Sequence, residues 1–259
     1  MSFEHIRLEE SPAGFSTVTI ARPERLNALS GQTVDELRAA VEQVGASGAR
    51  CLLLTGEGRG FSSGADLASG GGLPADAGEA LEKHFNPLIE ALFALDIPVV
   101  AAVNGAAAGA GCSLALCADI VIAARSAYFL QAFVNVGLIP DAGATWLLPR
   151  LAGRARAMEM MLLGERIPAD RALEWGLISR VVDDAELMQE AVAVATNLAQ
   201  GPTVALGLIR KLSLNAEQLP LSEALAAERV AQRTAGSTND FKAAVLAFLQ
   251  KQQPRFQGR

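Results

Sequence analysis

The hydrophobic positions in the first 185 residues alternate between two spacings. Short apolar or alternating segments predict strands, and stretches with apolar residues three and four positions apart predict helices between them. The expected strands are 6–8, 18–20, 51–54, 98–103 and 119–122, and the expected helices run from the Thr33/Glu36 capping box to about Val44 and from Phe85 to Phe93. This alternation favours a largely parallel sheet covered by helices.

The strand pattern stops beyond about residue 185. Helical patterns follow at 185–199, 218–235 and 239–250. We therefore expect an α/β core over residues 1–200 and a C-terminal helical part over residues 201–259. The glycine run at 70–72 favours a mobile loop, and the folding of segment 69–90 would then shape any pocket beneath it.

Charge and cysteine usage exclude several classes of protein. The net charge is −6 and no run of five like charges occurs, so neither nucleic acid nor an anionic membrane is an expected partner. The N-terminus lacks a secretory pattern, and no apolar run reaches the ~18 residues of a membrane span. Three cysteines without metal-ligand spacing, Cys51, Cys112 and Cys117, indicate reduced core residues, a cytoplasmic location and no metal site.

Three short segments carry candidate chemistry: 61–67 (Phe-Ser-Ser-Gly-Ala-Asp-Leu), 104–112 and 137–143. The first two follow predicted strands, where ligands gather in open α/β folds. Small side chains at Ala65 and Ala110 would let a ligand oxygen approach the backbone N–H groups closely, as an oxyanion hole requires. Taken singly, each segment can also be a tight turn that merely saves space.

Residues 60–64 also match G-x-S-x-G, the nucleophile elbow of serine hydrolases, with Ser62 as the nucleophile. That scaffold needs a histidine late in the chain. The histidines are His5 and His84, and both come too early to complete the triad in the expected order. A serine hydrolase is therefore disfavoured, and His84 is expected on a helix surface or loop.

Together and in this order, segments 61–67 and 104–112 resemble the crotonase (enoyl-CoA hydratase/isomerase) family, and the likeness runs from about Phe3 to Phe256. The resemblance implies a spiral of ββα repeats with a C-terminal helical trimerisation part, assembled as a homotrimer or a dimer of trimers. It also implies a coenzyme A thioester as substrate, with no separate cofactor, and oxyanion-hole amides at Ala65 and Ala110. The positions implied to bind the substrate are Arg25, Leu26, Ser63, Asp66, Leu67, Gly109 and Phe133, with Phe248 and Lys251 reaching the nucleotide in a neighbouring subunit.

The chain departs from the hydratase pattern at two positions. Typical hydratases of the family carry glutamates where this sequence has Ser113 and Phe133. An unassisted hydroxyl is a poor base near neutral pH and phenylalanine exchanges no proton, so ordinary water addition is disfavoured. Asp141 remains as the acid/base candidate, with a pKa raised by burial. The alternative is that Asp141 caps the helix expected to begin near Gly143.

Segments 103–111, 119–127 and 137–143 further resemble the branch of the family that isomerises the ring epoxide of phenylacetyl-CoA to oxepin-CoA in phenylacetate degradation. That likeness implies an isomerase, which also moves double bonds in enoyl-CoA esters and works beside other enzymes of the pathway. Two alternatives stay open: an enoyl-CoA hydratase with unconventional water-holding groups, and a catalytically silent acyl-CoA-binding or assembly protein.

Overall fold

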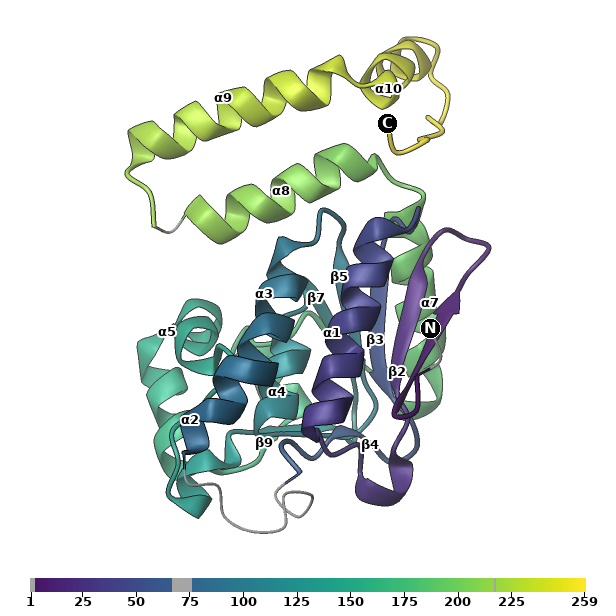
Figure 1. The fold of residues 1–259 in the computed structure, drawn as a ribbon. Helices are drawn as coiled ribbons and strands as arrows, with labels where there is room; N and C mark the ends of the chain where they lie inside the picture. The colour runs from purple at the N-terminus through teal and green to yellow at the C-terminus, as the bar shows by residue number, and fades with distance from the viewer. Residues whose placement is uncertain (1–2, 67–75, 217) are drawn as a thin grey trace.

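The computed structural model describes residues 3–66, 76–216 and 218–259. Its main element is a six-stranded sheet in the order β1-β2-β3-β5-β7-β10, in which β1 pairs antiparallel with β2 and the other neighbours are parallel. Its strands are β1 (Ile6–Glu10), β2 (Ser16–Ile20), β3 (Leu52–Gly56), β5 (Val99–Val103), β7 (Ile120–Ala124) and β10 (Arg180–Val182). The predicted parallel sheet is confirmed (Figure 1).

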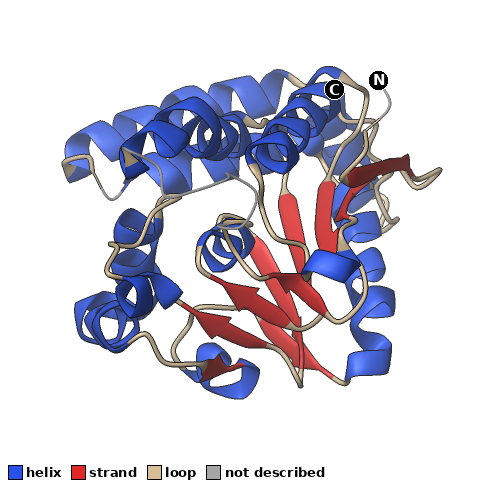
Figure 2. Cartoon of the chain, turned by 60° about the horizontal axis from the view of Figure 1, so that its bottom comes forward, coloured by secondary structure: helices blue, strands red, loops and turns tan. Residues whose placement is uncertain are grey.

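A second sheet of four short strands, in the order β4-β6-β8-β9, packs beside the first (Figure 2). Its strands are β4 (Gly60–Ser62), β6 (Ala106–Ala108), β8 (Tyr128–Leu130) and β9 (Ile167–Pro168). The chain adds one strand to each sheet in turn, as β3–β4, β5–β6 and β7–β8, with helical segments between these pairs. This is the expected spiral of ββα turns.

Helices cover both faces of the six-stranded sheet. On one face lie α1 (Gly31–Ala46) and α3 (Asn86–Ala94), and on the other lies α7 (Leu187–Ala199) (Figure 1). α1 buries an apolar stripe at helical spacing, and α7 buries alanines that let it approach the strands closely. The remaining helices of the core are α2 (Ala77–Ala80), the π-helix η2 (Leu81–Phe85), α4 (Ala110–Leu116), α5 (Ala144–Leu163) and α6 (Ala169–Glu174), with 3-10 turns η1 (Pro23–Arg25), η3 (Ala132–Val136) and η4 (Asp184–Glu186).

The chain ends in α8 (Thr203–Ala216), α9 (Leu221–Ser237) and α10 (Asn239–Leu249). α9 packs along α8, and α9 and α10 extend away from the sheets (Figure 1). The sequence pattern did not predict α8. One reason is that α8 meets the core through non-apolar residues: a Cβ on Gly207 would lie 2.2 Å from the carbonyl oxygen of Asp96, and buried Arg210 forms an ion pair with Asp119 at 2.8 Å.

Two further expectations concern mobility and membrane insertion. The glycine run at 70–72, expected to form a mobile loop, lies outside the described residues. In the described part of the chain no single helix is long and apolar enough to cross a membrane, and the sharply bent pair 184–199 and 203–216 meets that test only when joined.

Candidate active site

The first of the two candidate amides lies in a turn that follows β4. Leu29 pairs with Ala65 in a parallel bridge: the Leu29 amide donates to Gly64 O at 2.8 Å, and the Asp66 amide donates to Leu29 O at 3.0 Å. In a parallel bridge of this kind, the strand residue between the two bonded ones, here Ala65, points its N–H away from Leu29. Ala65 is exposed, and its amide donates no hydrogen bond within the described part of the chain.

Buried polar groups hold this first turn. The Arg22 guanidinium, with its side chain only 12% exposed, forms an ion pair with Asp66 at 3.1 Å and donates to the carbonyl of Ala28 at 2.6 Å. Ser62 donates to the carbonyl of Asn27 at 2.8 Å and accepts the amide of Gly64 at 3.2 Å. The predicted ligand Asp66 is thus occupied in positioning the turn.

The second candidate amide belongs to Ala110, the first residue of α4. Amides at this position have no carbonyl to bond within the helix, and the Ala110 N–H has no partner among the described residues. A Cβ on Gly111 would lie 2.5 Å from the Cβ of Ser62, so glycine is what lets α4 begin directly against β4.

The two turns are in contact at their glycines. Gly64 has φ +92° and Gly109 has φ +52°, both in the region that favours glycine. A Cβ on Gly64 would lie 2.7 Å from Ala108 O and 3.4 Å from Gly109 Cα. The glycines therefore bring together the two chain segments that carry Ala65 and Ala110.

Asp141 lies in a third turn, in front of α5. The Asp141 carbonyl accepts the Ala144 amide at 3.0 Å, and the residues between them have positive φ, +49° at Ala142 and +82° at Gly143. Gly143 is the N-cap of α5 and no side chain caps the helix, so the interpretation of Asp141 as a helix cap is wrong.

The carboxyl of Asp141 is poorly solvated. Its Oδ1 is buried and has no hydrogen-bond partner among the described residues. Burial raises the pKa of the Asp141 carboxyl to about 6, which confirms the predicted direction of the shift. At neutral pH the group is mostly ionised but is close enough to its pKa to both accept and return a proton.

The two positions where hydratases carry acids lie between these turns. Ser113 is 1% exposed, and its hydroxyl lies 3.0 Å from the carbonyl oxygen of Asp141. Phe133 is buried, and its Cζ would be 3.9 Å from a Cβ on Gly109, which places the ring beside the second turn. Neither side chain carries a carboxylate for water activation.

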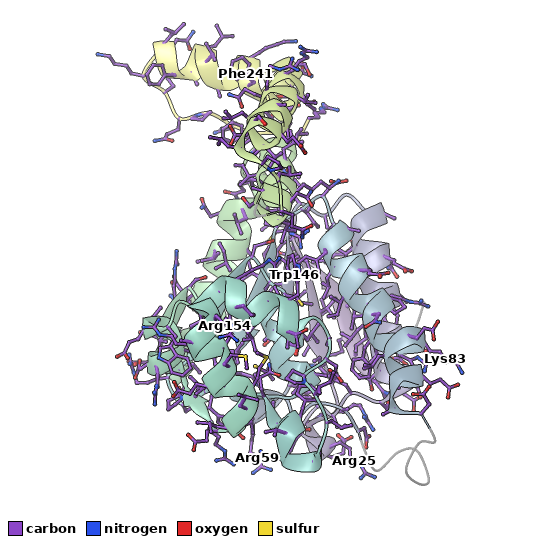
Figure 3. The ribbon with its side chains drawn as sticks, turned by 90° about the vertical axis from the view of Figure 1, so that its left-hand side faces the viewer. Arg25, Arg59, Lys83, Trp146, Arg154 and Phe241 are labelled. Carbon is purple, nitrogen blue, oxygen red and sulfur yellow. The ribbon has the colours of Figure 1, made fainter. Side chains whose placement is uncertain are left out.

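The other predicted ligands fall into two groups. Arg25, Leu26 and Ser63 adjoin the first turn, where the Ser63 amide donates to Leu26 O at 3.0 Å, and Figure 3 shows Arg25 at the end of the core opposite the C-terminal helices. Leu67 lies outside the described residues. Phe248 lies in the last turn of α10 and Lys251 follows that helix, which extends away from the turns of the same chain (Figure 1).

Sequence reasoning missed the residues that hold the first turn. Asn27 is fully buried, and its amide nitrogen donates to the carbonyls of Glu57 at 2.9 Å and Gly60 at 2.7 Å. Its partners lie 30 and 33 positions away, and Asp66 lies 44 positions from Arg22, so no local pattern reveals these contacts. The one available signal is that Arg22 and Asn27 flank a turn that begins at Pro23, where polar side chains commonly hold backbone groups.

Other chemistries find little support. The Ser62 hydroxyl is buried and bonded to Asn27 O, while His84 pairs with Asp35 at 2.9 Å on the α1 side, so the serine-hydrolase alternative fails on geometry as well. Burial raises the pKa of Cys112 to about 12, which leaves the thiol unreactive. Among the described residues no three His, Cys, Asp or Glu side chains gather to hold a metal ion.

Two backbone N–H groups without a partner among the described residues, on adjoining turns, together with a carboxyl of raised pKa on a third turn that Ser113 links to the second, are suited to an enzyme that stabilises an enolate. The family model described as enoyl-CoA hydratase/isomerase matches residues 10–259. The chain therefore belongs to the enoyl-CoA hydratase/isomerase family, whose members are enzymes and whose acyl-CoA chemistry fits this site.

Individual relatives differ in the reaction that their names state. The chain is 49% identical over 251 residues to the 1,2-epoxyphenylacetyl-CoA isomerase of Escherichia coli (strain K12), covering 95% of this chain and 96% of the relative. It is 45% identical over 259 residues to a probable enoyl-CoA hydratase of Rhodobacter capsulatus, with 100% of both chains covered. A solved structure of a putative enoyl-CoA hydratase/isomerase from Mycobacterium abscessus matches with TM-score 0.93 and 40% identity over 98% of this chain and 100% of the other.

Proposed function

We propose that this protein is an acyl-CoA isomerase that stabilises a thioester enolate, and that its substrate is 2-(1,2-epoxy-1,2-dihydrophenyl)acetyl-CoA, which it converts to oxepin-CoA in phenylacetate degradation. The relative with 49% identity supports the substrate. The observation that carries the reaction type is the Asp141 carboxyl, whose Oδ1 is buried without a partner among the described residues, on a turn that Ser113 of α4 contacts. Ser113 and Phe133 stand at the positions of the hydratase acids.

The chemistry is simplest for double-bond migration in an enoyl-CoA ester, which we propose as a second activity. The Asp141 carboxylate takes a proton from C2 of a 3-enoyl thioester, and the electron pair moves onto the thioester oxygen. The amides of Ala65 and Ala110 stabilise that oxyanion; one such donor is worth about 2.7–4 kcal/mol of barrier. The protonated Asp141 returns the proton at C4, so the 2-enoyl product forms without water.

Replacing Asp141 by Asn tests the acid/base role. We expect isomerisation and exchange of substrate C–H with deuterated water to fall about 10²–10⁴-fold, because Asn keeps the shape of the side chain but transfers no proton. Coenzyme A ester binding, measured by calorimetry, should be retained. Asp170→Asn is the control, because that carboxylate is exposed and pairs with Arg125. Full activity in Asp141→Asn would show that another group moves the proton.

Hydration is the second candidate, because relatives that align over nearly the whole chain are named hydratases. Incubation with crotonyl-CoA distinguishes the two reactions by the appearance of a 3-hydroxyacyl product. We expect negligible hydration, since Ser113 and Phe133 cannot activate water as glutamates do. A third reading, a silent acyl-CoA-binding or assembly protein, requires that no acyl-CoA ester exchange its C–H protons in deuterated water.

Substrate binding is proposed to involve a second copy of the chain. The other proposed substrate-binding positions lie in or beside the turns or follow them in sequence. They are Arg25, Leu26, Ser63, Asp66, Leu67, Gly109 and Phe133. Phe248 is 81% exposed on α10, far from the turns of its own chain, which suits contact with the nucleotide in a neighbouring subunit of a homotrimer or dimer of trimers. Phe248→Ala and Lys251→Ala should then raise KM for acyl-CoA with little change in kcat.

A further inference from the structure

Ser113 carries an inference that rests on the proposed function. We propose that Ser113 is a positioning residue, whose hydroxyl ties the Asp141 turn to the peptide unit that presents the Ala110 amide. Ser113 occupies the position at which the hydratase pattern has an acidic residue. At this position the proposed role of the side chain is to donate a hydrogen bond and not to transfer a proton.

The contacts of Ser113 reach both halves of the site. Its hydroxyl oxygen lies 3.0 Å from the carbonyl oxygen of Asp141 and 3.4 Å from the carbonyl oxygen of Gly109. A hydroxyl has one proton, and the shorter distance favours Asp141 as its acceptor. The backbone N–H of Ser113 donates to Gly109 O at 3.2 Å, beside that of Cys112 at 3.0 Å. Ser113 therefore binds one turn with its side chain and the other with its main chain.

The Gly109 carbonyl matters because it belongs to the same peptide unit as the Ala110 amide. A peptide unit is planar, so donors that fix its C=O also fix the direction of its N–H. Bonds to the carbonyl further polarise the unit and strengthen the N–H as a donor. The amide of Ser113 thus helps aim the second oxyanion donor.

The Asp141 carbonyl is held by two donors, the Ala144 amide at 3.0 Å within its own turn and the Ser113 hydroxyl from α4. The first bond keeps the shape of the turn but fixes nothing relative to α4. Ala142, between them, has φ +49°, a conformation that an alanine adopts only under constraint. The hydroxyl of Ser113 links the Asp141 turn to α4. This link then sets the distance between the Asp141 carboxyl and the Ala110 N–H.

A series of substitutions at Ser113 tests this role. Ser113→Ala removes the donor, and Ser113→Cys keeps a similar shape with a weak donor. We expect kcat to fall about five- to tenfold in Ser113→Ala and by less in Ser113→Cys, with KM unchanged. A loss of this size corresponds to the free energy that one hydrogen bond contributes. The acid limb of the kcat–pH profile should also move to lower pH, because a loosened turn admits water to the Asp141 carboxylate.

Cys117→Ala is the matched control, because Cys117 is a small, buried residue at the opposite end of α4. It should lower thermal stability without changing kcat or the pH profile. Wild-type kcat and an unmoved acid limb in Ser113→Ala, or in Ser113→Cys should the alanine variant not fold, would overturn the positioning role. That outcome, with Asp141→Asn still inactive, leaves the proposed function standing; an active Asp141→Asn would instead overturn the function itself.

Discussion

The two turns that carry the Ala65 and Ala110 amides, the amide turns, adjoin the turn of Asp141, the acid turn. The two kinds of turn are held by different interactions. The amide turns are pressed together at Gly64 and Gly109 and fixed by buried polar groups such as Asn27. The Asp141 carboxyl has a buried oxygen with no partner among the described residues, and burial alone raises its pKa. The direction of the two amides proposed as oxyanion donors thus depends on backbone geometry, whereas the pKa of the proposed acid depends on exclusion of water. The two can be disturbed separately.

The largest effect on the amide side is expected from Gly64→Ala. The new Cβ would lie 2.7 Å from Ala108 O, so the two turns must move apart, and alanine is strained at φ +92°. We expect kcat/KM to fall about 10²–10³-fold, as on loss of one oxyanion donor. Steady-state kinetics on an enoyl-CoA ester measures this.

Gly153→Ala separates strain from displacement. Gly153 also has positive φ, +76°, but a Cβ there would meet no atom within 4 Å, and the residue lies within α5. This variant should lose stability and keep its kcat/KM. Equal kinetic losses in both variants would mean that general destabilisation, and not separation of the turns, lowers the activity.

The same contrast explains what could be predicted from the sequence. Five of the six strands of the large sheet were predicted, because β3, β5 and β7 are continuous apolar runs, as at residues 51–54, and β1 and β2 alternate apolar with polar residues. Strand β10 (Arg180–Val182) was missed, because three residues carry no periodicity. Strands β4, β6 and β8 have three residues each, too few for any periodicity, and α8 is anchored by the buried ion pair of Arg210 with Asp119. Pattern reasoning therefore gave the main layer, and the second sheet came only through the family likeness.

At the site, the small side chains of Ala65 and Ala110 predicted amides that a ligand oxygen can approach, and neither amide has a hydrogen-bond partner among the described residues. The raised pKa of Asp141 was also predicted, from the expected burial of this carboxyl, and burial is its cause. The ion pair of Arg22 with Asp66 was not, since its members are 44 positions apart. Contacts of that kind depend on how the spiral closes, which no local pattern contains.

A smaller effect is expected from Arg22→Ala, which removes the ion pair with Asp66 and the bond to the Ala28 carbonyl. Both side chains are largely buried, 12% and 9% exposed, so the loss should reach about 1–2 kcal/mol of stability. Because the first turn is loosened and not displaced, kcat/KM should fall only about tenfold.

Arg7→Ala is the matched control for that prediction. Arg7 forms an ion pair with Glu57, but the two side chains are 48% and 38% exposed, and such pairs contribute about 0–1 kcal/mol. Urea unfolding and kinetics of both variants measure the difference. Similar values for Arg22→Ala and Arg7→Ala would show that the buried pair does not hold the amide turn.

The smallest effect concerns the acid side, where Asp141→Asn should make the protein more stable. The folded-state pKa of about 6 lies above the ordinary value of 3.8, so the folded protein binds more protons between these values and loses stability as pH rises through them. The loss of stability from burying the ionised carboxylate is nearly complete above about pH 7. Asparagine is uncharged and causes no such loss. After allowance for partial exposure, we expect the variant to gain about 1–2 kcal/mol at pH 8 and less than about 0.5 kcal/mol at pH 4. Urea unfolding of both proteins at matched concentration and at the two pH values measures this. A gain independent of pH would mean that burial does not destabilise the ionised Asp141 carboxylate. Exclusion of water would then not distinguish the acid turn from the amide turns.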